Sequence, residues 1–423
     1  MTIVAVIIFA ILLAMLAGPV LYLLLLVIAA AFRRERRAIQ EFGRTPHRYL
    51  ILIPAHDEAQ ILPATLEWVK KLRINHPDAQ PPTVVVVADN CTDSTAQIAF
   101  QAGVKVYERH NLDKRGKGHA LEWAFERIPV DFPAYEAVVI FDADTMPDLD
   151  FLNAAERTLQ SGAQVIQGRY DVLKPGQTWR TALMYVAFVL YNHIRPLGRL
   201  ALGLSDGLRG NGMVFRREIL ERFPWQAFSL VEDIEYGNRL ASAEVKVTYA
   251  PGAKIYGQAA ANGAQATSQR LRWEGGRLAQ ARQDVPSLMK LAFKRRSFIP
   301  FDRAADLIIP PLGLLMALTM VLAVLNLAIW WWLGDPALGW LSLGWLALIA
   351  GEVSFVLGGL LVARAPGRAY LALVFAPIFI AWKMRIYAIL LLRRIPSEWV
   401  RTERTKIEAA DAPIQAASTA KLK

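Results

Sequence analysis

Long apolar runs frame a more polar middle of the chain. Residues 3–32 are almost wholly apolar, and three further apolar stretches lie near the C-terminus, at 306–333, 338–363 and 369–392. A bilayer core of ~30 Å is crossed by about 20 apolar residues in a helix, and each run reaches that length. The pattern predicts a membrane anchor at residues 1–34 and a membrane region at residues 305–395.

Positive charge follows the first apolar run instead of preceding it. Arg33, Arg34, Arg36 and Arg37 come directly after the run. A signal peptide carries its charge before the apolar core, so we interpret the run as a retained anchor. The positive-inside rule then places the chain from residue 33 onward in the cytoplasm.

The same rule limits the C-terminal crossings. Three further crossings would put the arginines that follow residue 392 on the outer side, which conflicts with the rule. Residues 369–392 also carry Lys383 and Arg385, which are costly in hydrocarbon. We therefore expect two full C-terminal crossings, a last segment partly at the interface, and a cytoplasmic tail at residues 396–423.

Between the apolar runs, short β-branched segments alternate with helix-like stretches. Candidate strands are 49–53, 84–87, 104–107 and 137–141, and candidate helices are 58–72, 93–102 and 117–127. Such alternation is typical of an α/β fold with a mostly parallel sheet and helices on both faces. In these folds ligands bind beyond the carboxyl ends of the strands. Polar clusters follow three candidate strands, at residues 54–58, 89–90 and 142–144, so the sequence predicts a site at that edge.

Composition and charge agree with a membrane protein. Of the 423 residues, 54% are hydrophobic, and the net charge is +11. The basic residues lie beside apolar runs, as in Lys294, Arg295 and Arg296, which favours an anionic membrane surface over nucleic acid as a partner. Residues 284–304 mix such charges with apolar side chains and are predicted to lie along the membrane surface. The single cysteine, Cys91, excludes an internal disulfide and fits a reducing compartment.

Two acidic motifs carry candidate chemistry. Asp142 and Asp144 follow a strand and could chelate Mg²⁺ or Mn²⁺ together with a diphosphate, although a loop acid before a turn is the alternative. A carboxylate at Glu232 or Asp233 could take the proton from an acceptor hydroxyl. Acidic residues also favour the first turn of a helix, which is the alternative for this pair.

The third motif is Q-x-x-R-W, formed by Gln269, Arg272 and Trp273. This spacing puts the three side chains on one face of a helix. Arg272 could neutralise a leaving diphosphate and Trp273 could stack on a sugar, while an amphipathic helix that packs a tryptophan is the alternative. The sequence has no P-loop pattern and no G-x-G-x-x-G after the first strand, which disfavours a P-loop protein and a nicotinamide oxidoreductase.

The three motifs in this order resemble the inverting family 2 glycosyltransferases, the group that includes cellulose, chitin and hyaluronan synthases. The resemblance covers residues 49–280. Segments 87–93, 115–121 and 210–213 look like the cellulose-synthase-like subgroup tied to bacterial exopolysaccharide synthesis. The resemblance implies a GT-A-type nucleotide-sugar-binding domain at residues 45–283, flanked by transmembrane helices.

The resemblance also implies roles for single residues on the donor side. The nucleotide-sugar-binding positions are Pro54, Ala55, Glu58, Asp89, Lys117 and Asp142. Among these Asp89 matches the acid that reads the uracil edge, and this chain has Ala88 where many relatives have a second acid. Asp144 matches the metal ligand, with Asp142 beside it. Lys117 lies between two glycines, so a turn before a helix is its alternative interpretation.

On the acceptor side, Asp233 matches the catalytic base, and Glu232 precedes it. The helix that borders acceptor and diphosphate is matched by Gln269, Arg272 and Trp273, and an acceptor-side loop by Gly210, Asn211 and Gly212. Residues 399–404 match a W-x-R-T-x-R ending that could cap the donor. We expect His56 and His119 to support the residues that contact the substrate, or to be structural, and not to be ligands.

The expected activity is transfer of a sugar from a UDP-sugar, with Mg²⁺ or Mn²⁺, to a lipid-linked or growing polysaccharide acceptor. A single displacement at the anomeric carbon would invert its configuration. The expected location is the inner or plasma membrane, in which a multi-pass protein faces the cytoplasm with its catalytic domain and contacts membrane lipids. Two alternatives stay open: a processive polysaccharide synthase, and a non-catalytic membrane subunit of a polysaccharide secretion complex.

Overall fold

The computed structural model describes residues 2–33, 44–173, 178–257 and 263–392 of the chain. The chain divides into two compact units. The sheet unit comprises Glu35–Pro175 and Leu204–Ala304, and the helical unit comprises Met1–Arg34, Gly176–Gly203 and Ala305–Arg394. The expected tail at residues 396–423 and its W-x-R-T-x-R ending lie outside the described residues.

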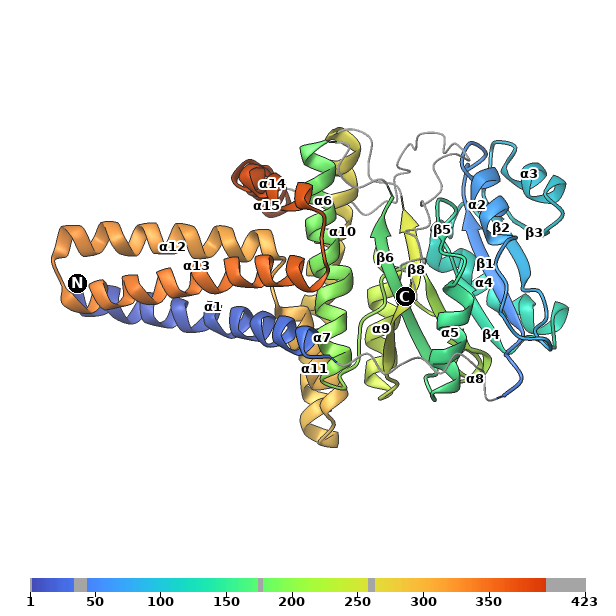
Figure 1. The fold of residues 1–423 in the computed structure, drawn as a ribbon, viewed down its shortest axis with the longest axis horizontal. Helices are drawn as coiled ribbons and strands as arrows, with labels where there is room; N and C mark the ends of the chain where they lie inside the picture. Colours follow the sequence, from blue (N-terminus) through green and yellow to red (C-terminus); the bar gives the residue numbers. More distant parts are fainter. Residues whose placement is uncertain (1, 34–43, 174–177, 258–262, 393–423) are drawn as a thin grey trace, which may run out of the picture. The chain divides into compact units, whose positions relative to one another are not determined.

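The described residues of the sheet unit form an eight-stranded sheet in the order β3-β2-β1-β4-β7-β6-β8-β5 (Figure 1). The four expected strands are confirmed and form its parallel half: β1 (Tyr49–Ala55), β2 (Thr83–Asp89), β3 (Lys105–Arg109) and β4 (Ala137–Ile140). The other half is β5 (Met146–Pro147), β6 (Val165–Val172), β7 (Met213–Arg216) and β8 (Val247–Gly257). Since β7 is antiparallel to both β4 and β6, the sheet is mixed, and the predicted α/β class is confirmed.

Helices cover both faces of the sheet. The described helices of this unit are α2 (Leu62–Val69), α3 (Thr95–Gln101), α4 (Lys117–Asp131), α5 (Phe151–Gln160), α8 (Arg217–Arg222), α9 (Glu232–Ser242) and α10 (Gly263–Arg295). The helix expected at 58–72 is shorter, because Pro63 in the first turn of α2 suits a helix start. The segment expected at 284–304 does not begin as an element of its own. Its first part belongs to α10, which continues through residue 284 to Arg295.

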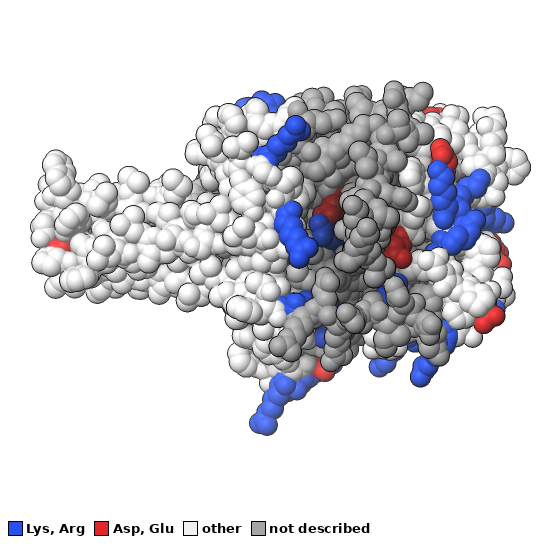
Figure 2. All heavy atoms as spheres, viewed as in Figure 1, with Lys and Arg blue, Asp and Glu red and all other residues white. Residues whose placement is uncertain are grey.

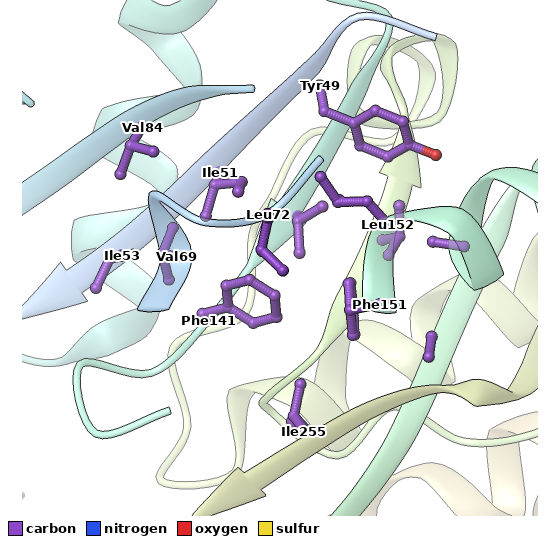
Figure 3. Packing of buried hydrophobic residues seen from close by; sticks show 14 of the residues in the cluster. Tyr49, Ile51, Ile53, Val69, Leu72, Val84, Phe141, Phe151, Leu152 and Ile255 are labelled. Carbon is purple, nitrogen blue, oxygen red and sulfur yellow. The ribbon is translucent and has the colours of Figure 1, made fainter. Parts of the chain in front are cut away.

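Alternate residues of β1 enter two different cores. Ile51 and Ile53 pack in the cluster that includes Val69 of α2, while Leu50 and Leu52 pack toward α4 on the other face. Figure 3 shows the first of these clusters. Burial on both faces is the reason why the parallel strands read as continuous apolar runs.

The helical unit contains α1 (Thr2–Ala31), α6 (Trp179–Val189), a π-helical turn η1 (Leu190–Ile194), α7 (Arg195–Ala201), α12 (Leu312–Leu333), α13 (Pro336–Val362), α14 (Gly367–Ala372), a 3-10 turn η2 (Leu373–Phe375) and α15 (Ala376–Leu392). Along the chain, the boundary between the two units falls within α11 (Phe298–Ile308), which follows α10 and precedes α12. The span expected at 306–333 therefore begins later, at Leu312. The cause is the Pro310-Pro311 pair, which ends one helix and starts the next.

Four helical segments are long and apolar enough to cross a membrane: Thr2–Ala31, Leu312–Leu333, Pro336–Val362 and Gly367–Leu390. In Figure 1 α1, α12 and α13 run side by side, whereas α15 is seen nearly end-on and so crosses them steeply. Figure 2 shows that these three helices present almost no charged atoms on the visible face. The expectation of two full C-terminal crossings and a last segment at the interface remains a prediction.

The long helices also bury a few polar side chains. Glu352 of α13 is 1% exposed and accepts a hydrogen bond from Thr319 Oγ1 of α12 at 2.8 Å. Asn326 of α12 donates to the carbonyl oxygen of Leu338 at 3.0 Å. The structure thus buries the carboxyl group of Glu352 between two helices.

Candidate active site

Lys117 is the centre of a charged cluster at the carboxyl end of β4. Its Nζ lies 2.5 Å from Oδ1 of Asp142, which follows β4, and 3.7 Å from Oε1 of Glu232, the first residue of α9. The same ammonium group donates a hydrogen bond to the carbonyl oxygen of Gly210. Three segments far apart in sequence therefore meet at one side chain, and the alternative that Lys117 serves only a turn is not what the structure shows.

The loop of Gly210, Asn211 and Gly212 packs directly on this cluster. Gly210 has a φ of 76°, and a Cβ there would lie 3.4 Å from Oδ2 of Asp233. Oδ1 of the fully buried Asn211 accepts hydrogen bonds from the Asp142 backbone N–H at 3.2 Å and from Thr145 Oγ1 at 3.0 Å. The loop expected on the acceptor side thus contacts both Asp233, the expected base, and Asp142, the expected acid of the donor side.

Gly212 satisfies a different requirement. Its φ is 65°, and a Cβ would meet Ile255 Cδ1 at 2.8 Å. Its N–H donates to the Ile140 carbonyl oxygen at 3.0 Å, at the end of β4. The left-handed backbone conformation favours glycine here.

The charges of the cluster alter one another. Burial alone would lower the pKa of Lys117, but Asp142 and Glu232 outweigh it and hold that pKa above its usual value. Burial raises the pKa of Glu232 to about 7, against the attraction of Lys117. Burial also raises the pKa of Asp233. Carboxyl groups whose pKa is raised in this way are candidates for proton transfer.

Asp142 and Asp144 suit a divalent cation that shares its ligands with a diphosphate. Both belong to the loop that follows β4, and Asp144 is only 2% exposed. Hard cations such as Mg²⁺ and Mn²⁺ take oxygen ligands and complete their coordination with water and phosphate. These two carboxylates, of which Asp142 pairs with Lys117, therefore fit such an ion, whose other ligands would come from water and the diphosphate.

The helix α10 brings the Q-x-x-R-W motif beside the start of α9. A Cβ at Gly276 would lie 2.8 Å from Val231 Cγ1, so α10 touches the residue that precedes Glu232. Gln269 is buried. In Arg272, Nε is buried and has no hydrogen-bond partner among the described residues. Trp273 lies beneath the guanidinium group of Arg270, 5.3 Å from it.

Asp89, at the end of β2, is held by a residue that the sequence did not single out. Arg109 Nη1 pairs with Asp89 Oδ1 at 2.5 Å, and both side chains are buried. Burial raises the pKa of Asp89, although the attraction of Arg109 opposes this effect. The two residues are register partners at the ends of β2 and β3. Arg109 lies two residues after the expected strand 104–107. Its place at the carboxyl end of a strand is the signal by which the sequence could have indicated it as a site residue.

The loop after β1 is also tied to the end of β2. Pro54 and Ala55 close β1, and the Glu58 N–H donates to Thr95 Oγ1 at 2.8 Å. His56 Nδ1 contacts the Asp89 carbonyl oxygen at 2.7 Å, which agrees with the structural role expected for it. His119, expected to be structural too, stacks on Phe228 with ring centroids 4.3 Å apart.

A mixed sheet with a charged cluster beyond its parallel strands is the frame of the GT-A-like nucleotide-sugar-binding class. Residues 46–276 match the model of the glycosyltransferase-like family 2. The chain belongs to this family, as the resemblance of its three motifs predicted.

Relatives with curated names match short parts of the chain. Glycosyltransferase AglD of Haloferax volcanii is 29% identical over 115 residues, which are 26% of this chain and 18% of that protein. The low-salt glycan biosynthesis hexosyltransferase Agl6 of the same organism is 35% identical over 100 residues, 23% of this chain and 23% of that protein. The alignments thus span about a fifth of the length of these relatives.

Among solved structures, the mannosyltransferase PcManGT of Pyrobaculum calidifontis is similar in fold. The TM-score is 0.52 at 16% sequence identity, over 84% of this chain and 98% of that chain. That structure was determined in complex with GDP-Man and Mn²⁺.

Proposed function

We propose that this protein is an inverting glycosyltransferase that uses a UDP-sugar and passes the sugar to a lipid-linked or growing polysaccharide acceptor. The observation that supports this most directly is the cluster in which Lys117 contacts Asp142, Glu232 and Gly210. It joins residues of the donor side to residues of the acceptor side. The names of the relatives support a role in glycan synthesis.

Asp233 is the proposed base. It is the second residue of α9 and lies next to Gly210, and its raised pKa suits the uptake of a proton from a sugar hydroxyl at neutral pH. The acceptor oxygen attacks the anomeric carbon from the face opposite the diphosphate, so the configuration inverts in one displacement. A positioned base of this kind contributes roughly 10²–10⁴ in rate.

The second task of the site is to neutralise the negative charge on the departing diphosphate. Lys117 contributes a fixed ammonium group, held by Asp142 and the Gly210 carbonyl oxygen. The buried Nε of Arg272 is a further donor on the neighbouring helix. A divalent cation, Mg²⁺ or Mn²⁺, supplies additional neutralisation when it is bound, and Asp144 with Asp142 would hold it.

The proposed location is the cytoplasmic face of the inner or plasma membrane. Four apolar helical segments and the arginines after the first of them support it. In this arrangement residues 284–304 lie along the lipid surface.

The test is release of nucleoside diphosphate by the purified, detergent-solubilised protein. UDP-sugars and GDP-mannose are offered with Mg²⁺ or Mn²⁺ and a membrane lipid extract as acceptor. We expect metal-dependent release from one UDP-sugar, lost in Asp233→Asn and retained in Asp78→Asn. Asp78 is a matched control because its side chain is 69% exposed. No release from any donor would instead favour the non-catalytic subunit.

A further inference from the structure

The nucleotide-binding edge contains a carboxylate whose two oxygens are not equivalent. Oδ1 of Asp89 accepts hydrogen bonds from Arg109 Nη1 at 2.5 Å and from Asn90 Nδ2 at 3.2 Å. A carboxylate oxygen has two lone pairs, so these two donors saturate Oδ1. Within the described part of the chain, Oδ2 accepts no hydrogen bond.

Arg109 is fixed so that it keeps Oδ1 occupied. It is 4% exposed, and its Nη2 donates to the Lys114 carbonyl oxygen at 2.7 Å. Asn90 is fixed as well: with a φ of 51°, it donates to the Asn111 carbonyl oxygen at 3.1 Å and accepts from the Asn111 N–H at 2.7 Å. The asymmetry of Asp89 is therefore built into the ends of β2 and β3.

We propose that Arg109 determines the nucleobase preference of the site by leaving Asp89 a single acceptor oxygen. The pairing edge of uracil has one donor, N3–H, between two carbonyl oxygens, and a single acceptor satisfies it. The corresponding edge of guanine has two adjacent donors, N1–H and the N2 amino group, which require both oxygens of a carboxylate. Guanine at this position would leave a buried donor without a partner, which costs about tenfold or more in affinity.

Arg109 thus acts as a positioning residue through Asp89. This inference rests on the proposed function, because it assumes that a nucleoside diphosphate binds with its base at Asp89. The same guanidinium group also holds the Lys114 carbonyl oxygen, three residues before Lys117. Arg109 therefore connects the base-reading carboxylate to the segment that presents the ammonium group of the charged cluster.

The experiment is calorimetric titration of the full-length protein in detergent with UDP and with GDP, each with Mn²⁺. We expect UDP to bind at least tenfold more tightly than GDP, and Arg109→Met to reduce this ratio to about threefold or less. Arg109→Lys keeps a donor to Oδ1 and should preserve the preference. The matched control is Arg48→Met, because Arg48 pairs with Glu136 at the opposite end of β1 and should leave the ratio unchanged.

Asn90→Gly is the second variant, used also if Arg109→Met does not fold. It frees the other lone pair of Oδ1, and glycine tolerates the left-handed φ of Asn90. A reduced ratio in this variant supports the proposal. Equal binding of UDP and GDP by the unmodified protein, or a ratio unchanged in folded Arg109→Met or in Asn90→Gly, overturns the role of Arg109. Binding of neither nucleotide would refute the proposed function itself, so the two failures are distinguishable.

Discussion

Two glutamates, the fully buried Glu156 and the half-buried Glu232, lie at opposite edges of the sheet and differ in their surroundings. At the amino end of β1, Glu156 accepts hydrogen bonds from the hydroxyl of Tyr49 at 2.8 Å and from Gln160 Nε2 at 2.7 Å, and it pairs with His47 Nδ1 at 3.0 Å. At the carboxyl end of β4, Glu232 lies beside another carboxylate, Asp233, and 3.7 Å from Lys117.

The difference appears in the acidity of the two groups. Burial alone would raise the pKa of Glu156, but the hydrogen bonds of His47 and Tyr49 outweigh it and hold that pKa below its usual value. At Glu232 burial prevails and raises the pKa to about 7. A carboxylate with enough donors stabilises the fold, whereas one that lacks them reduces stability and remains available for chemistry.

The largest expected effect is on the catalytic edge. Asp233→Asn removes the proposed base and should lower sugar transfer by roughly 10²–10⁴. The melting temperature should not fall, because the variant also removes a buried carboxylate with a raised pKa. Transfer rates and thermal melting of the same preparation check both statements. A fall in melting temperature with unchanged turnover would reverse the roles assigned to the two edges.

At the opposite edge, Glu156→Gln should affect stability and not chemistry. The amide cannot accept from all the donors around it, and unsatisfied buried donors cost about 1–3 kcal/mol each. We expect the melting temperature of the sheet unit to fall by roughly 5–10 °C, with turnover per folded molecule retained. Glu67→Gln, an exposed partner of Lys71 on α2, is the matched control and should change little.

The pH dependence of stability should have opposite signs at the two edges. Glu232 has a raised pKa, so the unfolded chain ionises first, and the protein loses stability relative to Glu232→Gln as pH rises from about 4.5 to about 7. Glu156 has a lowered pKa, so its contribution is present above ~4.3 and is lost as pH falls through its folded value. Melting curves from pH 3 to pH 8 for both variants test the signs, and parallel curves at both edges would contradict them.

The smallest expected effect concerns one donor of Glu156. His47→Gln keeps a polar side chain near the carboxylate and should cost about 1 kcal/mol, which corresponds to a fall of roughly 2–4 °C in melting temperature. Melting temperatures of His47→Gln and Glu156→Gln, measured side by side, check this difference. If the single change costs as much as Glu156→Gln, the donors act as one unit and not separately.

Much of the parallel half of the sheet was predictable from local pattern. The runs at β1, β2 and β4 are buried on both faces, so apart from Thr83 and Asp89 at the ends of β2 they are almost wholly apolar, and the strands are visible in the sequence. The strand β8 was missed because Pro251 and Gly252 interrupt it and its pairing with β6 shifts register at Gly168 and Arg169. Local propensity does not reveal a strand that depends on its neighbours for its shape.

The helical unit shows a similar limit. Residues 176–203 lie in the middle of the region expected to be catalytic, yet Val189, Leu190 and Ile194 pack in one cluster with Trp345 of α13. The segment is no more apolar than a core helix. Only its partners, which are distant in sequence, assign it to the helical unit.

By itself the sequence determined the family, the apolar runs, the four parallel strands and the residue types of the site, because each depends on neighbours in the chain. The tertiary structure alone decided that Lys117 bridges Asp142 and Gly210 and that Arg109 holds Asp89. It also decided which of the two glutamates has enough hydrogen-bond donors. These facts depend on distances between segments 20 to 109 residues apart. Charge and hydrogen-bond balance arise only when the chain has folded and water has been excluded.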